Sequence, residues 1–363
     1  MYRFIRPLFF ALSPHTAHAA GSAALAPLEY CAPLRNLVRA YCLPKDARLR
    51  TEAMGVTFLS PVGLAGGFDK NAVRARALGA LGFGFLELGT VTAQAQQENA
   101  RPNLFRLPQD RALINRLGFP NEGAARVAKR VAARQIASVG DVPIALSIGK
   151  SRSVPVESMG DVIADYSASL RAVLPHGRFV VVNVSSPNTA NLRTMQRQEH
   201  ASVLLNELSA IAGAVPLLLK IAPDLTDGEL EALLEAVDSA KIAGVVATNT
   251  TLSRANLRSS ASLVEQIGAG GLSGPPLFER ARAIVSRCRR RLGPRATIVG
   301  VGGIGTAEEA FSMIAAGANL VQLYTSFIYH GPLTARQLSR DLSAIVEREG
   351  GRNIAEFVGT KMW

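Results

Sequence analysis

Residues 297–309, with the sequence TIVGVGGIGTAEE, contain the pattern that decides the fold. A short β-branched run is followed by a glycine-rich turn, and Thr306 and Glu309 then form the Thr-x-x-Glu pattern of a helix N-terminal capping box. The stretch therefore predicts a strand, a tight turn and a helix, in that order. A second capping box, at Thr226 and Glu229, follows another apolar run and predicts the same unit.

Short apolar runs alternate with helical patterns along most of the chain. Eight of the runs are candidate strands: residues 62–64, 83–88, 143–148, 179–183, 216–221, 244–248, 297–301 and 320–323. Regular alternation predicts parallel strands, and eight units in about 290 residues match a closed barrel. An open doubly wound sheet usually begins with a dinucleotide-binding glycine fingerprint, which is not found here. We therefore predict an α/β fold, a (β/α)8 TIM barrel over residues 51–363, with an N-terminal helical membrane-associating extension over residues 1–50.

Composition sets limits on the class of protein. Of 363 residues, 48% are hydrophobic and 19% are charged, which excludes disordered and fibrous chains. The 40 lysines and arginines against 28 aspartates and glutamates give a net charge of +12, and this favours a phosphate cofactor, an acidic substrate, nucleic acid or an anionic membrane as partner. The three cysteines form no C-x-x-C pair, which argues against disulfides and structural zinc. No run approaches the ~18 apolar residues of a membrane-spanning helix.

The first 50 residues contain two short amphipathic patterns. Each places apolar side chains on one helix face: Phe4, Ile5, Leu8, Phe9 and Leu12 in the first, and Leu34, Leu37, Val38 and Tyr41 in the second. Basic residues surround both: Arg3, Arg6, Arg35, Arg39, Lys45, Arg48 and Arg50. An apolar face with a cationic rim is typical of a helix lying in a membrane interface, and equally of helices that only cap a domain. A secretory signal is disfavoured, because the apolar centre at residues 8–12 is shorter than the expected ~7 to 15 residues.

Neutral amides follow the predicted strands, at the end of a barrel where active sites are built. Asn183 and Asn188 follow the fourth strand, Asn249 follows the sixth, and Asn115 lies in the loop after the second. Because an amide both donates and accepts hydrogen bonds, several in one pocket suit a planar ring with alternating carbonyl and N–H groups, such as a pyrimidine. Each asparagine alone could instead form a turn or a helix cap.

Lysines and glycines at other strand ends indicate anionic ligands. Lys70 follows the first strand and Lys220 ends the fifth, and a lysine inside a barrel mouth needs an anionic or electron-rich partner. Gly302 and Gly303 follow the seventh strand, where barrels commonly bind phosphate, although a tight turn would also need glycine. The strand ends carry no glutamate pair, catalytic histidine or metal-ligand cluster, so a cofactor must carry the reaction.

Two long segments, residues 90–115 and 250–275, interrupt the alternation. Long barrel loops usually cover a site. Residues 104–106 and 112–114 in the first segment could form a small hairpin over the barrel mouth.

Seven motifs, in the same order, resemble those of class 2 dihydroorotate dehydrogenases: residues 67–70 (GFDK), 115–119 (NRLGF), 183–189 (NVSSPNT), 220–223 (KIAP), 248–251 (TNTT), 270–274 (GGLSG) and 300–304 (GVGGI). The resemblance implies oxidation of dihydroorotate to orotate in pyrimidine biosynthesis, with FMN as cofactor and a membrane quinone as electron acceptor. It implies cofactor contacts from Gly66, Gly67, Lys70, Thr90, Ser147, Asn183, Lys220, Thr248, Gly274, Gly303, Tyr324 and Thr325. It implies substrate contacts from Lys70, Asn115, Arg116, Leu117, Gly118, Phe119, Asn183, Asn188, Asn249 and Thr250.

The catalytic residues implied by the resemblance are Ser186, Thr189 and Phe119. Ser186 would remove the C5 proton of dihydroorotate while hydride passes from C6 to flavin N5. A serine hydroxyl is a poor base in water, so we expect help from Thr189 or an ordered water in a closed pocket. Class 1 enzymes carry cysteine at this position, so Ser186 and the N-terminal helices both indicate class 2.

Class 2 enzymes reoxidise their flavin with a quinone that enters between the N-terminal helices, and the resemblance assigns His18, Arg106 and Tyr324 to that route. We therefore expect a peripheral membrane protein on the cytoplasmic side of a bacterial inner membrane, in contact with anionic lipid. We expect a monomer that binds no nucleic acid.

Three residues depart from the family pattern. Ser147 stands where the family usually has asparagine, Pro120 replaces a common asparagine after Phe119, and Gly66 replaces a usual alanine. Serine keeps a donor and an acceptor but is shorter, so a water could bridge the gap at position 147. We expect altered ligand affinity rather than loss of activity.

Three alternatives compete with this interpretation. A soluble flavin barrel that uses fumarate or NAD would differ in the acceptor that oxidises the reduced enzyme. A nucleic-acid-binding protein would use the basic run Arg287, Arg289, Arg290, Arg291 and Arg295, but the run has no interleaved aromatic residues and resembles a solvated helix face. A cofactor-free barrel isomerase would be colourless when purified.

Overall fold

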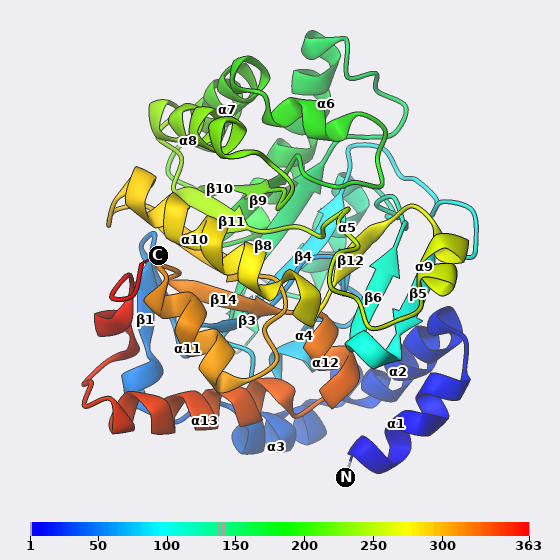
Figure 1. Cartoon of the computed structure of the whole chain (residues 1–363), viewed down its shortest axis with the longest axis vertical. Coiled ribbons are helices and arrows are strands. Elements are labelled where there is room, and N and C mark those ends of the chain that lie inside the picture. The colour runs from blue at the N-terminus through cyan, green and yellow to red at the C-terminus, as the bar shows by residue number, and fades with distance from the viewer. Residues whose placement is uncertain (1, 137, 140–141, 363) are drawn as a thin grey trace.

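The computed structural model describes residues 2–136, 138–139 and 142–362. Its centre is a closed parallel barrel in which each strand pairs with the next and β4 pairs with β8 to complete the ring (Figure 1). The eight strands, in ring order, are β3 (Val62–Leu64), β4 (Phe85–Val91), β8 (Val142–Gly149), β9 (Phe179–Asn183), β10 (Leu217–Ile221), β11 (Gly244–Ala247), β13 (Thr297–Val301) and β14 (Leu320–Leu323). All eight predicted strands are confirmed, four with the predicted bounds and four with ends that shift by at most three residues.

A layer of helices surrounds the barrel. The helices that follow the barrel strands are α4 (Ala75–Gly79), α5 (Ala124–Ala133), α6 (Met159–Val173), α7 (Gln198–Ala212), α8 (Asp227–Ser239), α10 (Phe278–Leu292), α11 (Ala307–Ala315) and α13 (Thr334–Arg348), with α9 (Ala261–Ile267) and α12 (Thr325–His330) in loops. Both predicted capping boxes are present. The hydroxyls of Thr226 and Thr306 accept from the backbone N–H groups of Glu229 and Glu309. Each glutamate carboxylate in turn accepts from the backbone N–H of its threonine. These caps define where α8 and α11 begin.

Aromatic side chains close the amino-terminal end of the barrel. A hairpin of β1 (Thr51–Ala53) and β2 (Val56–Phe58) precedes the first barrel strand. Its Phe58 ring lies 5.5 Å from that of Phe85 and 6.3 Å from that of Phe179, both at the start of barrel strands. All three side chains are fully buried. These rings fill the amino-terminal end of the barrel, and the cavity described below lies at the opposite, carboxyl end.

The two long loops form a small sheet beside the barrel mouth. The predicted hairpin is confirmed as β5 (Leu104–Leu107) and β6 (Ala112–Asn115). The second loop adds β12 (Gly271–Ser273), which pairs with β6 and sets Gly271 opposite Asn115. The sequence did not predict this third strand.

The described part of the N-terminal segment contains three α-helices, α1 (Tyr2–Ala11), α2 (Pro14–Tyr30) and α3 (Ala32–Cys42), so the two predicted helices are confirmed as α1 and α3, and the prediction missed α2 between them. Pro14 starts α2 rather than ending a segment, because proline is tolerated in the first turn and the Ser13 hydroxyl caps the helix by accepting from Thr16 N–H. The alanine-rich α2 lacks a clear apolar stripe, and the sequence therefore did not show it.

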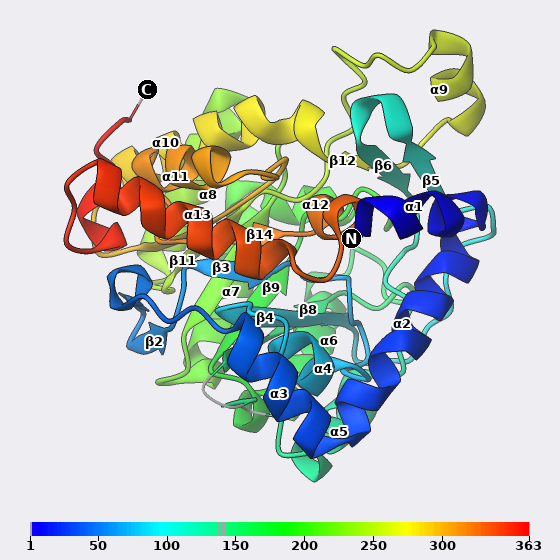
Figure 2. The ribbon, with the colours of Figure 1, turned by 90° about the horizontal axis from the view of Figure 1, so that it is seen from below.

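The N-terminal helices pack along one side of the barrel, with α1 beside α12 and α2 reaching from the β5–β6 hairpin to α4 (Figure 2). The Tyr2 hydroxyl donates to the Ile328 carbonyl at 2.8 Å, so the inner face of α1 is anchored. Phe4 and Leu8, on the outer face, are 71% and 70% exposed. Among the described residues, no helix combines the length and the apolar character needed to cross a bilayer.

Candidate active site

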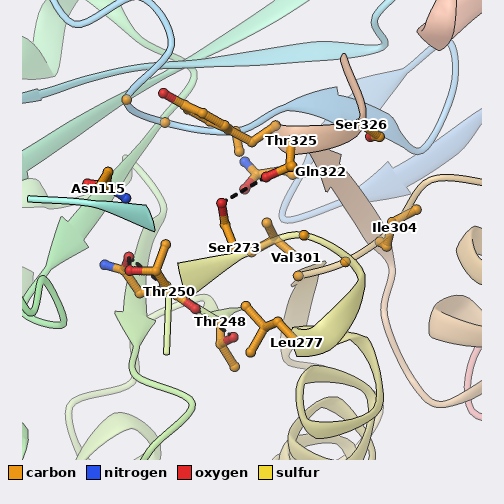
Figure 3. A pocket seen from close by; sticks show the side chains of 18 of the residues that line it. Asn115, Thr248, Thr250, Ser273, Leu277, Val301, Ile304, Gln322, Thr325 and Ser326 are labelled. Atoms are coloured by element: carbon orange, nitrogen blue, oxygen red, sulfur yellow. Dashed lines mark hydrogen bonds between the residues drawn. The ribbon is translucent and has the colours of Figure 1, made fainter. Parts of the chain in front are cut away.

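A cavity opens at the carboxyl end of the barrel, beneath the β5–β6–β12 sheet. The space free of protein atoms among its lining residues is about 1290 Å³, with open solvent at the mouth included. Figure 3 shows that its lining side chains come from several strand ends, with Asn115 and Thr250 on one side and Ile304, Thr325 and Ser326 on the other.

Most of the residues proposed from the sequence line this one cavity. They are Gly66, Gly67, Lys70, Thr90, Asn115, Leu117, Gly118, Phe119, Asn183, Ser186, Asn188, Lys220, Thr248, Asn249, Thr250, Gly274, Gly303, Tyr324 and Thr325. Five other proposed site residues are not among the described residues that line the cavity: Arg116, Ser147, Thr189, His18 and Arg106.

The amides form two hydrogen-bonded groups in the lining of the cavity. Asn183 Nδ2 donates to Thr90 Oγ1 at 3.0 Å, and Asn249 Nδ2 donates to Ser185 Oγ at 3.0 Å. Asn188 Nδ2 donates to Asn115 Oδ1 at 3.0 Å, and this bond joins the loop after β9 to the small sheet. These hydrogen bonds hold the amide planes in fixed orientations, which suits recognition of a planar ring.

Ser186 lies among these amides and is 5% exposed. Its Oγ accepts from the Asn188 backbone N–H at 3.2 Å. Arg193 clamps the surrounding loop, donating to the carbonyls of Ser185 and Thr250. The hydroxyl is therefore held in a buried position that faces the cavity.

Three residues proposed for the site lie behind it. Thr189 Oγ1 is buried and has no hydrogen-bond partner among the described residues, and Ser186 is not bonded to it. Ser147 is fully buried, with its Oγ 3.0 Å from Thr90 Oγ1, so it supports a lining residue. Arg116 donates to the carbonyls of Ile267 and Ala269 and thereby ties the second loop to the small sheet.

Lys70 supplies a cation at the amide side of the cavity. Its Nζ donates to the Gly67 carbonyl at 2.7 Å. Burial lowers the pKa of Lys70 to about 8, although the nearby Asp69 carboxylate opposes the shift. Asp69 in turn accepts from the backbone N–H groups of Val73 and Arg74, and this fixes the turn that carries Lys70. An ammonium of this kind can bind the carboxylate of a ligand.

Lys220 has an anionic partner within the chain that sequence reasoning missed. Glu87, in the middle of β4, is fully buried and its Oε1 lies 3.1 Å from Lys220 Nζ. Gln322 Nε2 donates to Glu87 Oε2 at 2.8 Å. A single carboxylate within an otherwise apolar strand is the signal that could have identified it.

Glycines shape the other side of the cavity. Gly274 and Gly303 have positive φ values of 108° and 76°, and a Cβ at position 303 would lie 2.7 Å from Phe278 Cβ. The hydroxyls of Ser273 and Thr325 lie 2.8 Å apart beside them (Figure 3). Exposed backbone N–H groups in such a turn suit a phosphate. The sequence did not single out Arg111, Ser326, Tyr329 or His330, which also line this side.

The proposed quinone-route residues touch the cavity through aromatic neighbours. The His18 ring on α2 lies 5.9 Å from that of Phe68, which lies 5.8 Å from the ring of Tyr324. Burial lowers the pKa of His18, and the Lys70 charge lowers it further. Arg106 lies 4.7 Å above the Phe10 ring and donates to the Phe10 and Leu12 carbonyls at the end of α1. A line of contacts thus connects the N-terminal helices to the barrel mouth.

Three of the five arginines in the basic run make contacts within the chain. Arg287 pairs with Asp227 at 2.7 Å and Arg291 with Glu231 at 2.6 Å. Arg289 is 6% exposed and donates to the Gly317 carbonyl. These pairs favour a structural role for the run over nucleic-acid binding.

Comparison with known proteins gives one consistent result. A family model described as Dihydroorotate dehydrogenase matches residues 48–346. A dihydroorotate dehydrogenase (quinone) from Clavibacter michiganensis is 47% identical over 341 residues, covering 94% of this chain and 97% of its own, and one from Rhodococcus erythropolis is 44% identical over 361 residues, covering 99% of each. The solved structure of DHODH from Eimeria tenella in complex with ferulenol superposes with a TM-score of 0.84 at 30% identity, covering 96% of this chain and 95% of that chain.

Proposed function

Because the chain belongs to the dihydroorotate dehydrogenase family, we propose that it oxidises dihydroorotate to orotate in pyrimidine biosynthesis and passes the electrons to a quinone. The observation that carries this function is the meeting of Ser186, the hydrogen-bonded amides and Lys70 in one cavity whose opposite side is lined by glycines. The curated relatives are named for a quinone acceptor, which favours quinone over fumarate or NAD.

The residues of the cavity fit FMN as the cofactor. Gln322 Oε1 and Ser326 Oγ are buried atoms of lining residues with no hydrogen-bond partner among the described residues, so the protein leaves polar atoms for a ligand to satisfy. The turns at Gly274 and Gly303, with Thr325, would hold the phosphate, and Thr90 and Lys220 would contact the ring system. When bound, FMN supplies the acceptor for the hydride that leaves C6 of the substrate.

The protein's own residues orient the substrate and handle its proton. Lys70 would bind the substrate carboxylate, while Asn115, Asn188 and Asn249 would bind the carbonyl and N–H groups of the ring. Ser186 would accept the C5 proton as the C5–C6 double bond forms, leaving orotate. Phe119, 9% exposed in the lining, would exclude water from the reacting atoms.

Proton removal by Ser186 requires help from a neighbouring group. Thr189 follows Ser186 by three residues and keeps an unpartnered hydroxyl in the same buried loop, and an ordered water is the other candidate. In a Thr189→Val variant the pH dependence of the reductive half-reaction should change if the threonine assists. An unchanged pH–rate profile would exclude Thr189 and leave the water.

The N-terminal extension, residues 1–50, would bind the surface of an anionic membrane and admit the quinone. Its outer face exposes Phe4 and Leu8, while the contacts through His18 and Arg106 run toward the barrel mouth. The exposed apolar side chains support peripheral membrane binding, and we propose a monomer on the cytoplasmic side of a bacterial inner membrane.

An absorbance spectrum of the purified protein tests the central proposal. We expect flavin bands that bleach when dihydroorotate is added without oxygen. A colourless protein that binds no added FMN would contradict it.

A second experiment separates the two half-reactions. Deleting residues 1–45, or the milder pair Phe4→Ser and Leu8→Ser, should leave flavin reduction by dihydroorotate intact and impair vesicle binding and turnover with quinone. Equal loss of both half-reactions would contradict the role of the extension.

A further inference from the structure

The floor of the cavity contains a buried ion pair that spans the barrel. Glu87 on β4 and Lys220 on β10 are 0% and 5% exposed, and Gln322 on β14 is 1% exposed. Lys220 and Gln322 line the cavity, whereas Glu87 lies outside the described lining and contacts both of them. The carboxylate is therefore positioned to act on a bound ligand only through these two neighbours.

Hydrogen-bond chemistry determines how the Gln322 and Lys220 side chains are oriented around the Glu87 carboxylate. An ionised carboxylate only accepts hydrogen bonds, so Gln322 must turn its Nε2 toward Glu87. The Gln322 Oε1 atom is then left as a buried acceptor without a partner among the described residues. The Lys220 ammonium is held on the other carboxylate oxygen.

The residue at position 66 makes room for this arrangement. A Cβ added to Gly66 would overlap Glu87 Oε1, the oxygen that pairs with Lys220, and would lie 2.8 Å from Glu87 Cδ. An alanine at this position would require the carboxylate to move. The departure from the family pattern at Gly66 is thus linked to the geometry of the pair.

We propose that Glu87 is a positioning residue that orients the Lys220 ammonium and balances its charge, so that bound flavin meets a neutral pair instead of a lone cation. The proposal rests on the proposed function, because it takes FMN as the cofactor. Reduction adds negative charge to a flavin ring, and a lone buried cation beside it would stabilise the reduced form. Glu87 therefore keeps the flavin from being too weak a reductant toward its acceptor.

The experiment compares Glu87→Gln, which removes the charge at constant shape, with Glu87→Asp, which keeps the charge. For each holoenzyme we would measure the flavin midpoint potential and the dissociation constants of oxidised and reduced FMN. In Glu87→Gln the ratio of the dissociation constants of oxidised and reduced FMN should rise about tenfold or more. This change corresponds to a positive shift of about 30 mV in the midpoint potential of a two-electron couple. The midpoint potential should shift much less in Glu87→Asp. In the double variant Glu87→Gln/Lys220→Met it should return toward the wild-type value.

If Glu87→Gln does not retain FMN, the free energy of unfolding of the apoprotein variants tests the proposal in place of the midpoint potential. Removing one charge of a buried pair should destabilise the apoprotein more than removing both charges. The double variant Glu87→Gln/Lys220→Met should therefore lose less free energy of unfolding than the two single variants lose in sum. An unchanged potential in a flavin-loaded Glu87→Gln variant, or additive losses of stability when no flavin is retained, would overturn the proposal. Failure of the wild-type protein to bind FMN would instead overturn the proposed function.

Discussion

Lys70 should make orotate binding depend on pH in a defined direction. Lys70 lines the cavity, and burial lowers the pKa of its side chain to about 8 from an ordinary value of 10.5. Below pH 8 the side chain is an ammonium that can pair with the ligand carboxylate, which is ionised at every pH near neutrality. Above pH 8 the free enzyme loses this charge, so orotate affinity should fall as the pH rises.

The size of the effect follows from the strength of a charged hydrogen bond. Such a bond contributes about 1.5–3 kcal/mol, which corresponds to about tenfold to about 150-fold in affinity. Bound orotate stabilises the ammonium and raises the pKa of Lys70 in the complex, so the loss should spread over about one to two pH units and then level off. Replacement of Lys70 by glutamine should remove about the same binding energy at neutral pH.

Orotate titrations followed by the flavin spectrum, from about pH 6.5 to about pH 10, would measure this dependence. We expect a declining affinity in the wild type, a weak and flat profile in Lys70→Gln, and wild-type behaviour in the exposed control Lys129→Gln. A flat wild-type profile, or a Lys70→Gln variant that keeps the wild-type slope, would refute the reasoning.

Three further changes test other contacts. Ser186→Ala should slow flavin reduction by dihydroorotate by about 10²- to 10⁴-fold in stopped-flow measurements while orotate affinity stays within a few-fold, and a reduction rate near wild type would exclude Ser186 as the base. Ser147→Ala removes the contact with Thr90 and should lower the free energy of unfolding by about 1 kcal/mol with FMN affinity nearly unchanged, whereas a large loss of FMN affinity would indicate direct contact. Glu29→Ala, on α2, leaves the Ala77 N–H without its acceptor and should lower the unfolding free energy by about 1–3 kcal/mol in denaturant titrations, and a neutral result would show that this buried carboxylate does not anchor α2.

Local patterns explain most of what could be predicted. The barrel strands and the capping boxes at Thr226 and Thr306 depend on neighbouring residues, so their periodicity is visible in the chain. The hairpin of β5 and β6 was predicted for the same reason. The alanine-rich α2 was missed because alanine forms helices without marking a face, and β12 was missed because its partner strand lies about 150 residues earlier.

The same distinction between local patterns and tertiary contacts applies to the candidate site. Strand-end position alone predicted that Asn183, Asn188 and Asn249 would meet, because parallel strands in a barrel all end at one rim, whereas Ser186 was assigned through the family resemblance. It could not separate Ser186, which faces the cavity, from Thr189, three residues away and outside the lining. That distinction depends on the conformation of a loop and on the side chains that clamp it.

By itself, then, the amino-acid sequence determined the order of the barrel strands, the end of the barrel that carries the site and most of the polar groups there, since all of these follow from local periodicity and strand polarity. Only the tertiary structure decided that Glu87 pairs with Lys220 and Gln322, that Gly66 leaves space for the carboxylate, and that Ser147 supports Thr90 from behind. Each of these contacts joins residues on different strands or strand ends that are separated in the chain. They exist only once the barrel has closed and brought those strands to one interior.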